Sequence, residues 1–470
     1  MPQPLCANPR HADDATKDSS HAIEVGRAQI WHPFTQMQEF LGVPPLSILS
    51  GRGGWLTDTD GRTYIDGNAS IWTNVHGHND ADLNAALIRQ LGQAAHSTLL
   101  GLTHPVGASL AEELVSLAPA GLNHVFFSDN GSNAVEIALK LSFQFWQLSG
   151  RPERRNVIGM AGGYHGDTFG CMAVGDSGGF HERFRSWCFP TSHFPAPLCK
   201  EWAGRVLASD SSASLKALET LLDAHAKTIA CLIMEPSVQG AAGMRLQPAG
   251  FLREVERLCR AHEVHLILDE VFVAFGRLGT MLVSGEEGVR PDFLCLAKGL
   301  SGGYLPLAAT LARGEIFDAF LGSYESHRAF FHGHTFTGNP LAAAVALESI
   351  RKLKPLIGEG VLSARIARFG HLINEAFASH PRISEIRQRG FAAALDLAPA
   401  AGRPERFPEA DRVGIKVCLK AREHGLILRP LGDSLLLVPP LCLNEEELGE
   451  LVRRTARSIQ DVLPSGHLIR

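Results

Sequence analysis

The sequence predicts an α/β fold in which a large domain is built on a mostly parallel sheet and a smaller α+β domain is attached. Three observations predict it. Short, almost wholly apolar segments alternate with amphipathic segments of helical length, as parallel strands alternate with covering helices. Several of these apolar segments lead directly into loops that contain Gly or Pro. From about residue 350, charged amphipathic helices and short alternating strands replace this pattern.

The individual elements follow in chain order. Segment 122–147 begins with the largely apolar LNHVFF, passes through SDNGSN and becomes amphipathic, which predicts a strand, a tight loop and a helix. A strand followed by a loop is predicted again for 155–163 and 229–240. Segment 249–270 predicts an amphipathic helix and then the strand VHLILD. Near the C-terminus, strands are predicted in FAAALDL (391–397) and SLLLVPP (434–440).

Composition and charge disfavour several classes of function. A formal net charge of −5 over 470 residues offers no basic surface to nucleic acid or to an anionic membrane. The nine cysteines are scattered without a CxxC pair, which favours free thiols in a reducing cytosol over disulfides or zinc. No apolar run is long enough to span a membrane, and residues 1–22 are predicted to be a mobile polar lead. We expect a soluble cytoplasmic protein.

Ligands bind at the carboxyl ends of the strands in open α/β sheets, so the loops after the strands are candidate sites. SDNGSN (128–133) would bring small residues and a helix N-terminus to an anionic group, although an ordinary capped helix start is the simpler interpretation. AGGYHGDTFG (161–170) places Tyr164 and His165 between glycines, either facing a cleft or in a structural turn. Asp269 ends the strand VHLILD, as a helix cap or as a buried acid.

Lys298 follows another apolar strand, FLCLA (293–297). In a dry site the pKa of a lysine falls enough for its amine to attack a carbonyl carbon, whereas a lysine reaching the surface is the plainer alternative. An anion seat, an aromatic ring, an acid and a reactive lysine together suit pyridoxal phosphate. The lysine bonds to the aldehyde carbon of this cofactor, and the acid keeps its pyridine nitrogen protonated. The sequence therefore predicts a pyridoxal phosphate site around Asp269 and Lys298.

The spacing between these two residues, 298 − 269 = 29, and the flanking DEVFVAFGRLG and LAKGLSGG closely resemble the class III aminotransferases of fold type I. The resemblance extends over nearly the whole chain from about Ile30 through IWHPFTQM, NVHGHND, GGYHGDTFG, EPSVQGAAGM, HGHTFTGNP and LRPLGD. These motifs are most similar to the branch that aminates 8-amino-7-oxononanoate to 7,8-diaminononanoate in biotin biosynthesis. The amino donor of that branch is usually S-adenosylmethionine.

The resemblance implies roles residue by residue. Lys298 would bond to the cofactor and then act as the base that moves a proton, while Asp269 would pair with the pyridinium nitrogen. Thr335 would complete the phosphate site of the other subunit, which implies a homodimer with shared active sites. Further cofactor contacts are implied for Gly131, Ser132, Tyr164 and His334.

The same resemblance implies the substrate site and the domains. Arg429 would bind the carboxylate of the substrate, for which its planar guanidinium is suited. Residues 23–75 and 346–470 would together form the small domain beside a large cofactor domain of residues 76–345. Further substrate contacts are implied for Phe34, Ile71, Trp72, Tyr164, Lys298 and Gly333.

Four departures from the family pattern bear on the amino donor and on the cofactor site. Phe34 stands where the branch often has Tyr, ASIW replaces SSWW so that Ile71 precedes Trp72, and His334 replaces Pro. These variants also occur in relatives that resemble a lysine-using branch, so lysine and simple ω-amines stay open as donors beside S-adenosylmethionine. Segment 272–274 is FVA where ATG is usual, and the sequence does not explain how Phe272 fits beside a cofactor.

Two further motifs suggest other chemistry. GDSGG (175–179) matches a serine-hydrolase nucleophile motif at Ser177, but the sequence around it shows no strand, turn and helix, which the nucleophile elbow requires. The two HGH motifs, 76–78 and 332–334, have spacing compatible with metal binding, but no third ligand is suggested. We therefore expect no metal, and a hydrolase only as a remote alternative.

Overall fold

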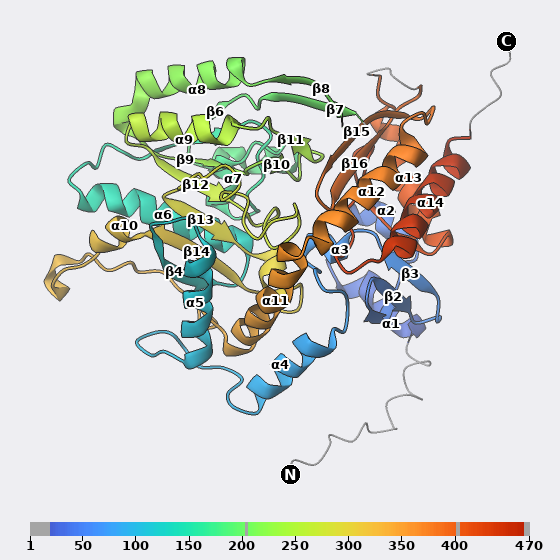
Figure 1. Ribbon diagram of the computed structural model, residues 1–470, viewed down its shortest axis with the longest axis horizontal. Coiled ribbons are helices and arrows are strands. Elements are labelled where there is room, and N and C mark those ends of the chain that lie inside the picture. Colours follow the sequence, from blue (N-terminus) through green and yellow to red (C-terminus); the bar gives the residue numbers. More distant parts are fainter. Residues whose placement is uncertain (1–18, 203–204, 401–404, 465–470) are drawn as a thin grey trace.

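The computed structural model describes residues 19–202, 205–400 and 405–464, and its centre is a seven-stranded sheet with helices around it (Figure 1). The strand order is β4-β14-β13-β12-β9-β5-β6. Neighbouring strands are parallel except at β14, which runs antiparallel to both β13 and β4. The strands are β4 (Leu122–Ser128), β5 (Asn156–Met160), β6 (Thr191–Phe194), β9 (Ile229–Met234), β12 (His265–Asp269), β13 (Phe293–Leu296) and β14 (Ala308–Arg313).

Helices cover both faces of this sheet. Successive residues of a strand point to opposite faces, so a wholly apolar strand needs a cover on each side. Leu266 and Leu268 of β12 belong to a core cluster that includes residues of α8 and α9, whereas Ile267 belongs to a second cluster with α6. Every residue of β9 and β12 is buried. The expected α/β fold with a mostly parallel sheet is confirmed. The helices of this region are α4 (Ala81–Leu91), α5 (Pro105–Leu117), α6 (Gly131–Leu148), α7 (Phe169–Val174), α8 (Ser212–His225), α9 (Phe251–Ala261), α10 (Gly314–Asp318) and α11 (Pro340–Gly358).

The N-terminal and C-terminal segments meet in a second region (Figure 1). Strands β1, β2 and β3 form a sheet with β17, in which Ile65 pairs in parallel with Leu426. A further sheet has the order β15-β16-β19-β18. The strands are β1 (Ile48–Arg52), β2 (Trp55–Asp58), β3 (Thr63–Asp66), β15 (Ile383–Arg389), β16 (Ala392–Leu397), β17 (Leu426–Ile427), β18 (Arg429–Leu431) and β19 (Ser434–Leu437). The helices are α1 (Ser19–Gln29), α2 (Met37–Gly42), α3 (Ala69–Trp72), α12 (Val361–Phe377), α13 (Val413–Glu423) and α14 (Glu445–Val462).

The structure bears on the strands and the N-terminal lead that the sequence predicts. The strand predicted in 391–397 is β16, and the one predicted in 434–440 is β19, which ends three residues earlier at Leu437. The lead predicted for residues 1–22 falls mostly outside the described residues, and α1 already begins at Ser19. The domain boundaries stay a prediction. In the part of the chain that the structure describes, no helix combines the length and the apolar character needed to cross a membrane.

Candidate active site

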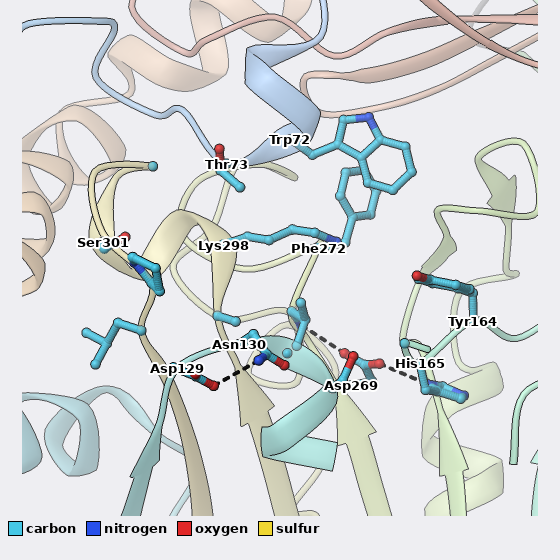
Figure 2. A pocket seen from close by; sticks show the side chains of 18 of the residues that line it. Trp72, Thr73, Asp129, Asn130, Tyr164, His165, Asp269, Phe272, Lys298 and Ser301 are labelled. Atoms are coloured by element: carbon cyan, nitrogen blue, oxygen red, sulfur yellow. Dashed lines mark hydrogen bonds and ion pairs between the residues drawn. The ribbon is translucent and has the colours of Figure 1, made fainter. Parts of the chain in front are cut away.

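A cavity of about 470 Å³ lies where the strands β4, β12 and β13 end (Figure 2). Strands β4, β12 and β13 run in the same direction, because β14, which lies between β13 and β4, is antiparallel to both. Their carboxyl ends therefore lie at one edge of the sheet. This is the edge at which ligands bind in open α/β sheets. Residues predicted for the site that line the cavity are Trp72, Gly131, Ser132, Tyr164, Asp269 and Lys298.

Lys298 begins a short 3-10 turn directly after β13, in the left-handed backbone region with φ of 45°. Burial lowers the pKa of its amine, and the nearby Asp269 and Glu235 carboxyl groups oppose this effect. Its Nζ lies 5.0 Å from the ring centroid of Trp72 and 5.6 Å from that of Phe272. The amine therefore projects into the cavity against an aromatic wall (Figure 2).

Asp269 is the last residue of β12, and only 5% of its surface is exposed. Its Oδ1 accepts the backbone N–H of Val271 at 3.0 Å, and its Oδ2 lies 2.8 Å from Nδ1 of His165. His165 is buried, and its Nε2 has no hydrogen-bond partner among the described residues. Two donors thus hold the carboxylate at the floor of the cavity, where it can stabilise a positive charge.

The start of α6 provides an anion seat at one end of the cavity. Asn130 caps the helix by accepting the N–H of Asn133, and the N–H groups of Gly131 and Ser132 lie in the first turn, where a helix has no acceptors of its own. A Cβ on Gly131 would lie 2.7 Å from Cγ1 of Val271, and one on Gly166 would collide with the Ser132 side chain. The close packing therefore requires glycine at both positions.

Phe272 fits beside the lysine because of a neighbouring glycine. Its ring is 5% exposed and packs against Trp72 at 4.6 Å between centroids. A Cβ on Gly240 would lie 3.0 Å from the Phe272 ring and 3.2 Å from that of Trp72. The absence of a side chain at Gly240 thus makes room for the aromatic pair.

Trp72 reaches the cavity from an unusual turn. Ala69, Ser70, Ile71 and Trp72 have φ of 45°, 47°, 65° and 70°, so α3 is a single left-handed turn. Left-handed helical backbone costs roughly 1–2 kcal/mol per residue that is not glycine. Such strain persists only where surrounding contacts hold it in place.

Tyr164 is held by groups that the sequence did not single out. Its phenol donates to Oδ2 of Asp167 at 2.9 Å, and its backbone N–H donates to Oε1 of Glu235 at 3.2 Å. Glu235 also accepts the N–H of Gly240, and burial raises the pKa of its carboxyl to about 7. Glu235 directly follows the predicted strand IACLIM. This position at the end of a strand could have marked it as a candidate site residue.

Ser177 belongs to a hydrogen-bonded series of the Ser, His and Asp type. Its Oγ lies 3.1 Å from Nδ1 of His181, whose Nε2 lies 2.9 Å from Oδ1 of Asp167. Ser177 follows helix α7 and precedes a 3-10 turn, so the strand that a nucleophile elbow requires is absent before it, as predicted. The other oxygen of Asp167 accepts from Tyr164, so the series ends at the cavity wall.

Other predicted site residues lie outside the cavity lining. Arg429 has its guanidinium 5.7 Å from the ring centroid of Phe34, and burial lowers its pKa. Nε2 of His334 lies 3.9 Å from Oδ1 of Asp129, a cavity residue. The described residues contain no cluster of three or more potential ligands that could hold a metal ion. The predicted residues not lining the cavity of this single chain are Phe34, Ile71, Gly333, His334, Thr335 and Arg429.

Comparison with known proteins connects this site to a family. The family model for class-III aminotransferases matches residues 41–459. A protein of Geobacter sulfurreducens named adenosylmethionine-8-amino-7-oxononanoate aminotransferase is 45% identical over 438 residues, 93% of this chain and 96% of its own. One of the same name from Aquifex aeolicus is 41% identical over 92% of this chain and 95% of its own.

Solved structures agree with these sequence matches. The crystal structure of adenosylmethionine-8-amino-7-oxononanoate aminotransferase from Methanocaldococcus jannaschii has a TM-score of 0.89 and 35% identity, covering 94% of this chain and 99% of that one. An (S)-enantioselective omega-transaminase from Thermomicrobium roseum has a TM-score of 0.85 and 30% identity, covering 94% and 98%. The chain belongs to the class-III aminotransferases.

Proposed function

We propose that this aminotransferase converts 8-amino-7-oxononanoate to 7,8-diaminononanoate in biotin biosynthesis, with S-adenosylmethionine as the amino donor. The observation that carries the proposal is the cavity that joins Lys298, Asp269 and the start of α6. The choice of substrates is supported by the shared name of the relatives from Geobacter sulfurreducens and Aquifex aeolicus. The buried Cys231, Cys259 and Cys295 form no disulfide, which supports a reducing, cytoplasmic setting.

The residues around the cavity fit pyridoxal phosphate, the cofactor of this family. The first turn of α6 and the close packing at Gly131 suit a phosphate group. The Asp269 carboxylate suits a protonated ring nitrogen, and the Tyr164 side chain lines the same cavity. When bound, the cofactor supplies a ring that stabilises negative charge on the carbon from which a proton is removed.

The chain's own residues would then divide the work. Lys298 would take a proton from the α-carbon of the donor through Nζ, and burial favours the neutral amine that this step needs. Asp269, held by the N–H of Val271 and by His165, would pair with the ring nitrogen of the cofactor. Arg429 would pair with the carboxylate of the oxononanoate, and its guanidinium interacts electrostatically with Tyr164, a residue of the cavity lining.

We further propose a homodimer in which each subunit completes the site of the other. Thr335 and Gly333 are exposed on a segment without regular secondary structure. The neighbouring Phe331 and Phe336 are 78% and 60% exposed, and Leu100 is 89% exposed. The two exposed phenylalanines that flank a predicted phosphate-binding threonine in the sequence are expected to be covered by a second copy.

Lysine as donor is the second candidate, because Phe34 lacks the hydroxyl group that would bond to S-adenosylmethionine. The Phe34 ring instead packs on the Arg429 guanidinium and on the Phe180 ring. The centroids of the Phe34 and Phe180 rings are 5.7 Å apart. Asp167, whose side chain is about half exposed next to Tyr164, offers a countercharge to a sulfonium or an ammonium group alike.

The test is a half-reaction. The protein loaded with pyridoxal phosphate is mixed separately with S-adenosylmethionine, lysine or putrescine, and conversion to the pyridoxamine form is followed by absorbance. We expect conversion with S-adenosylmethionine, followed by formation of 7,8-diaminononanoate when 8-amino-7-oxononanoate is added. Fast conversion by lysine alone would replace the donor. Conversion by putrescine without turnover of the oxononanoate would remove the protein from biotin biosynthesis.

A further inference from the structure

Hydrogen bonds to one buried carboxylate, that of Asp66, hold the left-handed turn Ala69–Trp72. Asp66 ends β3, and 1% of its surface is exposed. Its Oδ1 accepts the backbone N–H of Asn68 at 3.2 Å, and its Oδ2 accepts the hydroxyl of Ser70 at 2.8 Å. Both donors lie within or directly before the strained turn.

The same carboxylate also holds the segment that follows the turn. Nε2 of His78 lies 3.0 Å from Oδ2 of Asp66, and Nδ1 of His78 lies 3.2 Å from the amide nitrogen of Asn74. Because the Asn74 amide donates to Nδ1, the Nε2–H of His78 donates to Asp66. The side-chain oxygen Oδ1 of Asn74 in turn accepts the backbone N–H of Gly77 at 2.7 Å. Asp66 therefore links the chain on both sides of Trp72.

Trp72 is the part of this turn that faces the cavity (Figure 2). Its ring packs on Phe272, and its Nε1 donates to Oδ1 of Asn68 at 3.3 Å. Nζ of Lys298 lies against the same ring, at 5.0 Å from the centroid. A relaxed, right-handed backbone from Ala69 to Trp72 would send this ring in another direction and open the wall beside Lys298.

We propose that Asp66 is a positioning residue for substrate recognition: it holds the left-handed turn and so fixes Trp72 as the wall against which the aliphatic chain of the amino acceptor packs. Asp66 itself does not line the cavity. The identity of the acceptor rests on the proposed function, whereas the placement of Trp72 by Asp66 does not. Loss of the carboxylate should weaken acceptor binding more than it slows the chemical step.

Asp58 provides a matched control. It is also a buried carboxylate of the same sheet, 4% exposed, at the end of β2. It also accepts three hydrogen bonds, from the N–H groups of Asp60 and Arg62 and from the phenol of Tyr64. These bonds hold the hairpin between β2 and β3, and neither Asp58 nor its three donors line the cavity.

The experiment compares Asp66→Ala with Asp58→Ala in the cofactor-loaded enzyme. We expect Asp66→Ala to raise KM for 8-amino-7-oxononanoate at least tenfold, with kcat within threefold and normal cofactor content. Asp58→Ala should lower the melting temperature to a similar degree and change KM less than twofold. In a Trp72→Ala background, Asp66→Ala should have no further effect on KM. An unchanged KM in Asp66→Ala, or an undiminished effect without Trp72, would overturn the proposal.

Two additions keep the test decisive. If Asp66→Ala does not fold, Ser70→Ala removes one of the three bonds, and we expect a three- to fivefold rise in KM, so an unchanged KM again overturns the proposal. Near-ultraviolet circular dichroism reports on the Trp72–Phe272 pair without any substrate. We expect the difference spectrum of Asp66→Ala to match that of Trp72→Phe. If the wild-type enzyme does not use the oxononanoate, the proposed function fails while this spectrum still tests Asp66.

Discussion

The buried Glu235 should make the enzyme less stable as the pH rises from about 4.5 to about 7. Burial raises the pKa of its carboxyl from 4.5 to about 7. Between these values the folded protein binds more protons than the unfolded chain, so the free energy of unfolding falls with increasing pH. Below pH 4.5 both states are protonated and the penalty is absent, and above pH 7 it is present in full. The full interval corresponds to about 3 kcal/mol.

The substitution Glu235→Gln removes the titrating group and keeps an oxygen that can accept from Tyr164 or Gly240. From about pH 5.5 to about pH 8.5, linkage predicts that the variant gains about 2 kcal/mol relative to the wild type. For a chain of this length, that gain corresponds to a rise of roughly 2 °C in the difference between the two melting temperatures.

Differential scanning calorimetry at one scan rate and several pH values measures this difference. Glu359→Gln, at an exposed position after α11, is the control and should give a constant difference from the wild type. A constant or falling difference for Glu235→Gln would refute the reasoning, because it would mean that the carboxyl titrates alike in the folded and unfolded states.

Three further changes test the proposed chemistry. Lys298→Ala should reduce turnover by several orders of magnitude, and borohydride should no longer attach the cofactor to the chain. Lys140→Ala, on α6 outside the cavity lining, should retain the label, and a label at another lysine would contradict the role of Lys298. Asp269→Asn should keep the cofactor but lose at least about a hundredfold in kcat, since the charge matters most in the transition state, and near-normal turnover would contradict this. Phe34→Tyr should raise the rate of the half-reaction with S-adenosylmethionine by roughly ten- to a hundredfold, as expected for one hydrogen bond to a charged group. The rate with lysine should stay constant. An equal rise with both donors would argue against a hydroxyl group that acts on one donor only.

The centre of the site could be predicted because its chemistry stands at strand ends. Asp269 and Lys298 each follow an apolar strand, and the structure places both in one cavity. The packing around them could not be predicted in the same way, because it depends on residues brought together from different elements. Gly240 makes room for Phe272 and Trp72, although the three residues lie in separate segments.

Backbone conformation was the other feature that the sequence concealed. Nothing in ASIW indicates a left-handed turn, because none of these residues favours positive φ. Side-chain hydrogen bonds of Asp66 with Ser70 and His78 support the turn, and its backbone hydrogen bonds, such as Trp72 N–H to Asn68 O, close it. Sequence patterns report local preferences, so a conformation that opposes those preferences becomes visible only in the folded chain.

The pairing of β3 with β17 has a consequence for how the enzyme is made. Ile65 cannot find its partner Leu426 until the ribosome has produced nearly the whole chain. The pairing of β4 with β14 likewise joins residues near 125 to residues near 310. Contacts so distant in sequence form slowly, and the exposed strands are prone to aggregation meanwhile. The cofactor pocket, whose lining extends to Leu307, therefore cannot form until about two thirds of the chain has been made, and the sheet that contains β3 stays incomplete until β17 follows.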